Sequence, residues 1–200
     1  IPTTSSTNTI TFESESLDSS AVTIQYTPFN STNPAVFLLK GTDHVTFRHL
    51  GFKALPSGYS DVLELRYSAD HLTVSNCYFE GYHFGSSSVL IKCLNYGGFS
   101  DTMTIENSYF LNGQQAIYLY NGGFSQHEIN IHQNTFVNQR FGGLDVSFIR
   151  GLYILNNKFT SNTTSSSYKA IDLNSSDKYI EISGNDISLS SAGSGMFLDG

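Results

Sequence analysis

The sequence repeats itself with a period of about 27 residues, and this period limits the possible folds more than any other feature. The segment MTIENSYF at 103–110 returns as INIHQNTF at 129–136, and QAIYL at 115–119 returns as GGLDV at 142–146. Periods of this length are typical of repeat architectures, in which each unit buries its apolar face by stacking on its neighbours. The sequence therefore predicts a stack of similar units along the chain.

Each period contains a segment with apolar residues at alternating positions, the pattern of a strand with one buried face. These segments begin at Ile10, Phe37, Leu63, Ile91, Ile117, Leu144, Ile171 and Met196. Gly, Ser and Asn separate the apolar runs, and residues of high β propensity fill them. We therefore expect an all-β coil of about seven rungs of about 27 residues, whose equivalent strands pair in parallel roughly 4.8 Å apart.

A second segment of each period has two apolar residues separated by five positions, with turn-type residues between them. The pairs are Phe47/Phe52, Val74/Phe79, Ile105/Phe110, Ile131/Phe136, Ile154/Phe159 and Ile182/Ile187. The interval contains Asn76, Asn107, Asn134, Asn156 with Asn157, and Asn185, while His49 takes this place in the first pair. Asn tolerates unusual backbone angles and bonds to nearby backbone, so we expect an Asn-rich turn ladder with a structural role.

This pattern resembles the right-handed parallel β-helix of the pectate-lyase-like superfamily. It is most similar to the Asn-rich β-helix regions of large secreted and surface proteins of Bacteroidetes, on phrases such as NTITFESESLDSSAVTI (8–24), AIYLYNGG (116–123) and GMFLDG (195–200). The resemblance covers essentially the whole chain and implies a right-handed β-solenoid. It does not decide function, because the superfamily includes lyases, glycoside hydrolases, adhesins and phage tailspikes.

The composition narrows the class of partner. Charged residues make up 14% of the chain and the net charge is −7, which argues against nucleic-acid binding. A polar, weakly charged surface is common in secreted and cell-surface β proteins, so we expect one of those locations. No apolar run reaches the length of a membrane span. Cys77 and Cys93 are either a disulfide pair or two buried apolar residues, and we favour the second.

Both ends of the sequence look like cuts within a repeat. We therefore expect residues 1–200 to form a single β-helix segment of a longer chain, with neighbouring domains of that chain as partners.

One outward-facing row carries the residues most relevant to chemistry. If the alternating apolar residues point inward, the residues between them point out. This outward row contains Leu38, Glu64, Lys92, Tyr118, Asp145, Asp172 and Phe197, with Arg66 and Tyr120 beside it. Asp145 and Asp172 should lie on adjacent turns, and two such carboxylates could act as acid and base on a polysaccharide. The alternative is a pair of solvated acids on an outer sheet, and the basic residue and calcium cluster of the superfamily's lyases are not reproduced.

Aromatic residues near these acids are candidate ligand contacts. Tyr118 and Tyr120 could stack on sugar rings, although Tyr is also a favoured strand residue. The repeated GGFS motif places Phe99 and Phe124 on neighbouring turns, where they could form a binding ridge or cap the local core.

No complete catalytic or cofactor motif occurs in the sequence. Asp43-His44 returns as Asp70-His71, but Asp also suits a turn before a strand, so we expect no metal site and no cofactor. The leading hypothesis is a structural or adhesive extracellular segment that contacts polysaccharide or cell-surface glycans. The alternatives are a polysaccharide lyase or glycoside hydrolase that uses Asp145 and Asp172, and a trimeric phage tailspike or fibre segment.

Overall fold

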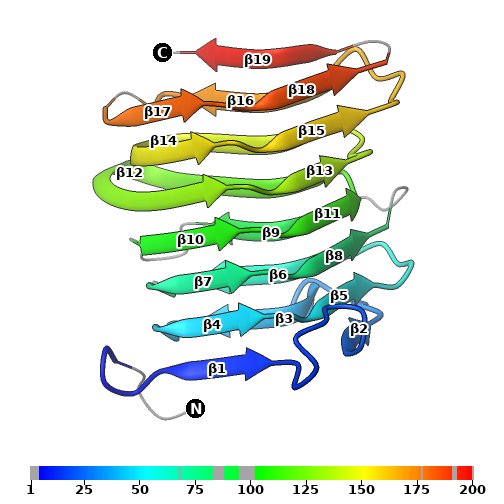
Figure 1. Cartoon of the computed structure of the whole chain (residues 1–200), viewed down its shortest axis with the longest axis vertical. Coiled ribbons are helices and arrows are strands. Elements are labelled where there is room, and N and C mark those ends of the chain that lie inside the picture. The colour runs from blue at the N-terminus through cyan, green and yellow to red at the C-terminus, as the bar shows by residue number, and fades with distance from the viewer. Residues whose placement is uncertain are drawn as a thin grey trace.

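A computed structural model shows the chain as a right-handed parallel β-solenoid, with its termini at opposite ends of the stack (Figure 1). The structure describes residues 5–67, 69–82, 88–94, 102–176, 178–190 and 193–199, except the side chains of 121–127. The coil makes about six turns, close to the expected number of rungs. The all-β fold class is therefore confirmed.

Each turn of the coil contributes strands to three faces. We call them A, B and C in the order in which the chain follows them around a turn, and the chain enters the coil on face B. Face A contains β3 (Ala35–Lys40), β6 (Asp61–Arg66), β9 (Val89–Leu94), β16 (Lys169–Asn174), β19 (Ser194–Asp199) and the first parts of β12 (Gln115–His132) and β14 (Gly142–Leu155). Face B contains β1 (Ile10–Glu13), β4 (Val45–Arg48), β7 (Leu72–Ser75), β10 (Thr102–Glu106), β17 (Ile180–Ser183) and the last parts of β12 and β14. Face C contains β2 (Thr23–Tyr26), β5 (Gly51–Ala54), β8 (Tyr78–Gly81), β11 (Tyr109–Asn112), β13 (Thr135–Val137), β15 (Lys158–Ser161) and β18 (Asp186–Leu189).

Strands of successive turns pair in parallel, as the period predicts. Face C is a seven-stranded sheet, and faces A and B join into one 12-stranded sheet because β12 and β14 continue around the bend between them. The register pairs Ile117 with Leu144, and Leu144 with Ile171, so residues one period apart lie above one another. The predicted stacking of equivalent segments is confirmed on face A.

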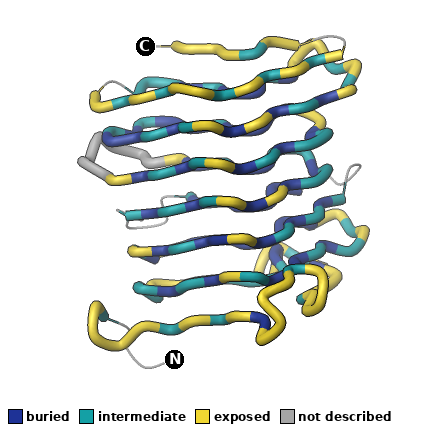
Figure 2. The backbone as a smooth tube through the Cα atoms, viewed as in Figure 1, coloured by how far each residue is buried: buried dark blue, intermediate teal, exposed yellow. Residues whose placement is uncertain are grey.

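The interior is filled by columns of identical or similar apolar side chains. On face C, five phenylalanines form a continuous stack with ring centroids 4.7 to 5.0 Å apart. The stack consists of Phe52, Phe79, Phe110, Phe136 and Phe159, all fully buried. Rings stacked with small interplanar angles gain attraction beyond the area that they bury. Figure 2 shows that burial is greatest in the middle turns, whereas the first and last turns are largely exposed.

The turn between faces B and C holds two residues from β4 onward, and they form two distinct columns. The first position is left-handed, with φ between 49° and 65°, and we call it the outer corner column: His49, Asn76, Asn107, Gln133, Asn156 and Gly184. The second position points inward, and we call it the inner corner column: Leu50, Cys77, Ser108, Asn134, Asn157 and Asn185.

The Asn ladder lies in the inner corner column. The Asn134 backbone N–H donates to Asn157 Oδ1 at 2.9 Å, and the Asn157 backbone N–H donates to Asn185 Oδ1 at 2.9 Å. Asn157 Nδ2 also donates to the Ile131 carbonyl at 2.8 Å. We expected one Asn ladder, but Asn76, Asn107 and Asn156 belong to the outer corner column instead. Asn suits both positions, because it accepts left-handed angles and also bonds to backbone, so the sequence alone does not separate them.

Both cysteines are free and buried, as we favoured. Cys77 occupies the inner corner column, where its N–H donates to Ser108 Oγ at 3.0 Å. Burial raises the pKa of the Cys77 thiol to about 11, so at neutral pH it stays protonated and acts as a small apolar residue.

Candidate functional site

The outward row predicted on face A exists, and we call it the face-A column. The register pairs Glu64 with Lys92, Tyr118 with Asp145, and Asp145 with Asp172. The column comprises Leu38, Glu64, Lys92, Tyr118, Asp145, Asp172 and Phe197. Apart from the pair Asp145 and Asp172, its members differ from turn to turn, unlike those of the phenylalanine stack. The column therefore offers varied chemistry on a regular support.

Asp145 is held by a neighbouring turn. Gln115 Nε2 donates to Asp145 Oδ2 at 2.7 Å, from the position three residues before Tyr118. Burial raises the pKa of the Asp145 carboxyl above its ordinary value, the hydrogen bond from Gln115 opposes this shift, and the charge of Asp172 adds to it. The Asp145 carboxyl is half-buried, and Asp172 is likewise of intermediate exposure.

Asp172 is held within its own strand. Lys169 Nζ contacts Asp172 Oδ2 at 2.7 Å and also lies 3.8 Å from the centre of the Phe197 ring. The other carboxylate oxygen, Oδ1, is buried and has no hydrogen-bond partner among the described residues. Because it is buried, this oxygen is not open to a ligand in this structure, and Oδ2 is the oxygen of Asp172 on which a ligand contact depends.

Two further ion pairs lie at the lower end of face A. Arg66 Nε contacts Glu64 Oε1 at 2.7 Å, and Lys92 Nζ contacts Asp61 Oδ2 at 2.7 Å. Asp61 and Glu64 are each only 1% exposed, and Asp61 also accepts the Val89 N–H at 3.0 Å. Buried charges of this kind are retained when they are paired. These contacts hold the lower part of the column in place.

Sequence reasoning missed Asp61 and Gln115, and it did not identify Lys169 as a partner of Asp172. All three occupy one register position, which runs Ala35, Asp61, Val89, Gln115, Gly142, Lys169 and Ser194 along face A. This position lies three residues before each member of the face-A column. A search for polar residues at that fixed offset would have found all three.

The structure describes two of the four predicted aromatic contacts, Tyr118 and Tyr120. Tyr118 is half-buried next to Asp145, and its pKa is raised by burial first and by the Asp145 charge second. Tyr120 lies in the adjacent outward position, exposed, with its ring in an edge contact to Phe148 at 5.6 Å. Phe99 and the side chain of Phe124 lie outside the described residues. The structure therefore brings together Tyr118, Asp145 and Asp172, with Tyr120 beside them.

This arrangement can do two things chemically. Two adjacent carboxyl groups, one of which has a raised pKa, can serve as a general acid and a general base. The same carboxylates, with the Tyr118 ring and phenol, can instead accept and donate hydrogen bonds to hydroxyl groups of a sugar. Gln115 contacts one carboxylate oxygen of Asp145, and Lys169 contacts one of Asp172. The other oxygen of Asp172 is buried, so the two acids are restricted as proton carriers.

The repeated Asp-His motif has a local structural role. The rings of His44 and His71 stack at a centroid distance of 4.1 Å, and the Asp70 N–H donates to Asp43 Oδ1 at 3.0 Å. In the parts of the chain that the structure describes, no three His, Cys, Asp or Glu side chains are grouped as metal ligands.

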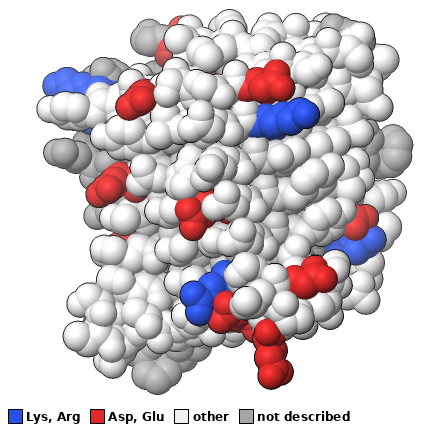
Figure 3. Space-filling model, viewed as in Figure 1, with Lys and Arg blue, Asp and Glu red and all other residues white. Residues whose placement is uncertain are grey.

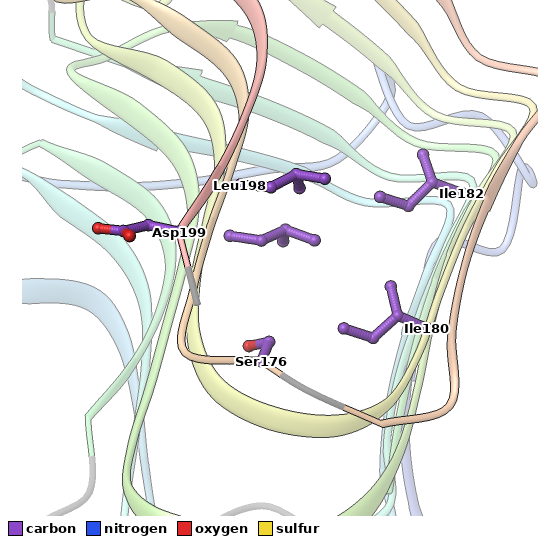
Figure 4. A pocket seen from close by; sticks show the side chains of 6 residues that line it. Ser176, Ile180, Ile182, Leu198 and Asp199 are labelled. Atoms are coloured by element: carbon purple, nitrogen blue, oxygen red, sulfur yellow. The ribbon is translucent and has the colours of Figure 1, made fainter.

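One cavity lies inside the last turn of the coil and has a volume of about 260 Å³. Its lining is mainly apolar, as Figure 4 shows: Leu173, Ser176, Ile180, Ile182, Leu198 and Asp199. Leu173 and Leu198 continue one inward column of the turns below, and Ile180 and Ile182 lie across the cavity from them. Because Leu198 is exposed, the cavity is the end of the apolar interior at the last turn. None of the described residues form a helix that is long and apolar enough to cross a membrane.

Comparison with known proteins agrees with this architecture. Residues 8–159 match the family described as right handed beta helix region. No curated protein and no solved structure matches the chain. The family match spans the turns that carry the phenylalanine stack and most of the face-A column. The chain therefore belongs to the right handed beta helix region family.

Proposed function

We propose that this chain is an extracellular structural and adhesive β-helix segment of a secreted or cell-surface protein, and that its face-A column contacts carbohydrate. The observation that carries the proposal is the run of Tyr118, Asp145 and Asp172 on three consecutive turns. An aromatic ring followed by two hydrogen-bond acceptors matches the alternation of apolar ring faces and hydroxyl groups along a glycan.

The spacing of this run supports a polymeric ligand. Successive members are about 4.8 Å apart along the stack, close to the length of one sugar ring, so one chain of sugars can touch several turns. The ion pair of Lys169 with Asp172 and the hydrogen bond of Gln115 to Asp145 fix the acceptors before binding. Preorganised groups lose less conformational entropy when a ligand binds.

The second candidate function is hydrolysis or elimination on a polysaccharide, with Asp145 as the proton donor and Asp172 as its partner. The raised pKa of Asp145 favours this reading, because a general acid must be protonated near the working pH. The contacts of Asp172 and Asp145 with Lys169 and Gln115 count against it, since both acids are already engaged.

A glycan panel tests the proposal. The intact chain is titrated by calorimetry with neutral and acidic plant, algal and bacterial polysaccharides, and the same mixtures are assayed for released sugar. We expect binding without turnover, and a two- to ten-fold loss of affinity in Tyr118→Ala, the order of one lost aromatic contact. Tyr153→Ala, at a tyrosine of intermediate exposure on face B, is the matched control and should bind normally.

The outcomes separate the two functions. Sugar release that disappears in Asp145→Asn would replace adhesion by catalysis. Equal affinity in wild type and Tyr118→Ala, or no binding to any member of the panel, would remove the face-A column as a carbohydrate contact.

A further inference from the structure

A groove runs along the corner between faces B and C, away from the face-A column. It has a volume of about 370 Å³. It is lined by Leu17, Asp18, Ser19, His49, Asn76, Cys77, Asn107 and Tyr109. One wall is therefore the loop after β1, and the floor is the outer corner column of the next three turns.

The wall is a local departure from the repeat. In the first turn, residues 14–22 replace the two-residue corner found from β4 onward. The loop is internally bonded, because the Leu17 N–H donates to the Ser14 carbonyl at 3.1 Å and the Ala21 N–H donates to the Asp18 carbonyl at 3.1 Å. It also packs closely on the next turn, where a Cβ at Gly51 would lie 2.8 Å from the Ser19 carbonyl oxygen. The wall is thus built into the fold.

The floor presents polar side chains in a row. The backbone N–H groups of His49 and Asn76 are used along the stack, donating to the Ser75 and Glu106 carbonyls at 3.2 Å each. Their left-handed backbone turns the side chains outward. Asn76 Nδ2 donates to Ser75 Oγ at 2.8 Å, whereas within the described residues the side chains of His49 and Asn107 form no hydrogen bond. The Asn76 carboxamide oxygen and the polar groups of His49 and Asn107 are therefore available to the groove that they line. Beyond it, Gln133 and Asn156 continue the same row of carboxamides.

An aromatic surface lies at the edge of the groove. Tyr109 is 38% exposed, and its ring stacks on that of Tyr78 at 5.7 Å with an interplanar angle of 10°. The stack holds the Tyr109 ring in one orientation. Such a ring offers a flat apolar face to one side of a sugar, while its hydroxyl stays available for hydrogen bonding.

The charge of the groove selects the class of ligand. Its lining contains the Asp18 carboxylate and no Lys or Arg. Hydrogen bonds from the Ser20 N–H and hydroxyl lower the pKa of Asp18, so this group is ionised at neutral pH. Figure 3 shows acidic and basic residues scattered over the side of the molecule formed by faces B and C. An acidic polysaccharide would meet a carboxylate without a compensating cation, which is unfavourable.

We propose that this groove is a second glycan site, which binds an uncharged oligosaccharide lying along the solenoid axis. The Tyr109 ring takes one sugar face. The Asn76 carboxamide oxygen and the Asn107 carboxamide bond to hydroxyls of successive sugars, one per turn of the coil. Asp18, exposed on the wall loop, accepts a hydroxyl at the edge of the groove. The site does not depend on the face-A column, so either site can fail without the other.

The test is a residue-resolved NMR titration of the whole chain with three neutral hexasaccharides, of β-1,4-linked glucose, mannose and N-acetylglucosamine. The galacturonate hexasaccharide is the anionic counterpart. We expect amide shifts at Asp18, Asn76, Asn107 and Tyr109 with at least one neutral probe, and none there with galacturonate. Tyr109→Ala should weaken binding about two- to ten-fold. Asn107→Asp keeps the left-handed turn but adds a charge and removes the amide donor, and it should also weaken binding.

Tyr26→Ala, at an equally exposed tyrosine outside the groove, is the matched control and should leave affinity unchanged. An amide spectrum that is unchanged away from the substituted residue and its neighbours verifies that each variant remains folded. No groove shifts with any neutral probe at millimolar concentration would overturn the proposal, as would stronger shifts with galacturonate. Shifts restricted to residues 115–120, 145 and 172 would place binding on face A alone and also overturn it.

Discussion

The inner corner column and the face-A column have the same spacing but obey different rules. In the upper turns the inner corner column repeats one residue type, and Asn134, Asn157 and Asn185 bond to one another. The phenylalanine stack repeats in the same way. The face-A column varies along the stack, from Glu64 and Lys92 to Tyr118 and then to Asp145 and Asp172. Identical residues stack where the environment is the same at each turn, whereas a varied column shows that packing does not dictate the side chain.

This difference distinguishes the inward columns, which stabilise the fold, from the outward face-A column, which we propose contacts a ligand. An inward position is surrounded by equivalent neighbours above and below, so the best residue at one turn is also best at the next. An outward position meets solvent and diagonal partners, such as Gln115 for Asp145, which differ between turns. We therefore expect changes in the repeated columns to affect stability and changes in the face-A column to affect binding.

The largest effect should come from the phenylalanine stack. Phe136→Ala removes a fully buried ring between Phe110 and Phe159 and should lower the free energy of unfolding by about 3–5 kcal/mol. Tyr118→Ala, on the outward face of the strand that precedes it, should lower it by about 1 kcal/mol or less. Urea denaturation followed by circular dichroism measures both. Equal losses would mean that the two columns do not differ as proposed.

A smaller effect should follow from breaking the Asn ladder. Asn157→Ala deprives the Asn134 N–H of its acceptor and the Ile131 carbonyl of a donor, and should cost about 1–3 kcal/mol. The adjacent Asn156→Gly is the control, because glycine accepts its left-handed angles, and a change within about 0.5 kcal/mol is expected there. The same denaturation assay applies. A loss at Asn156 as large as that at Asn157 would contradict the division into two corner columns.

The smallest effect should be the pH dependence contributed by Asp145. Its pKa is raised in the folded state above the ordinary value of 3.8, chiefly by burial, so the folded chain binds the proton more tightly than the unfolded chain. The contribution of this group to stability is therefore present at low pH and is lost as pH rises from 3.8 through the folded pKa. Asp145→Asn should show a weaker decline than wild type over that window. A steeper decline in Asp145→Asn would reverse the assigned sign.

Much of the site could be predicted from the sequence because the register of a solenoid follows directly from its period. Once Ile117 and Leu144 are known to stack, Tyr118 and Asp145 must stack as well. The partners of the acids were harder to predict, since a hydrogen bond from Gln115 depends on side-chain reach and burial. The corner groove was not predictable at all, because residues 14–22 fall outside the repeat and only their packing on Gly51 makes a wall.

The sequence by itself determined the coil, the inward columns and the order of residues along face A. It could do so because each turn has nearly the same length, so position within the period sets both the face and the neighbours. The tertiary structure decided which Asn residues form the ladder, which polar groups hold Asp145 and Asp172, and where the surface is hollowed. Those features depend on side-chain direction and on contacts between segments that do not repeat. The repeat pattern of the sequence indicates neither.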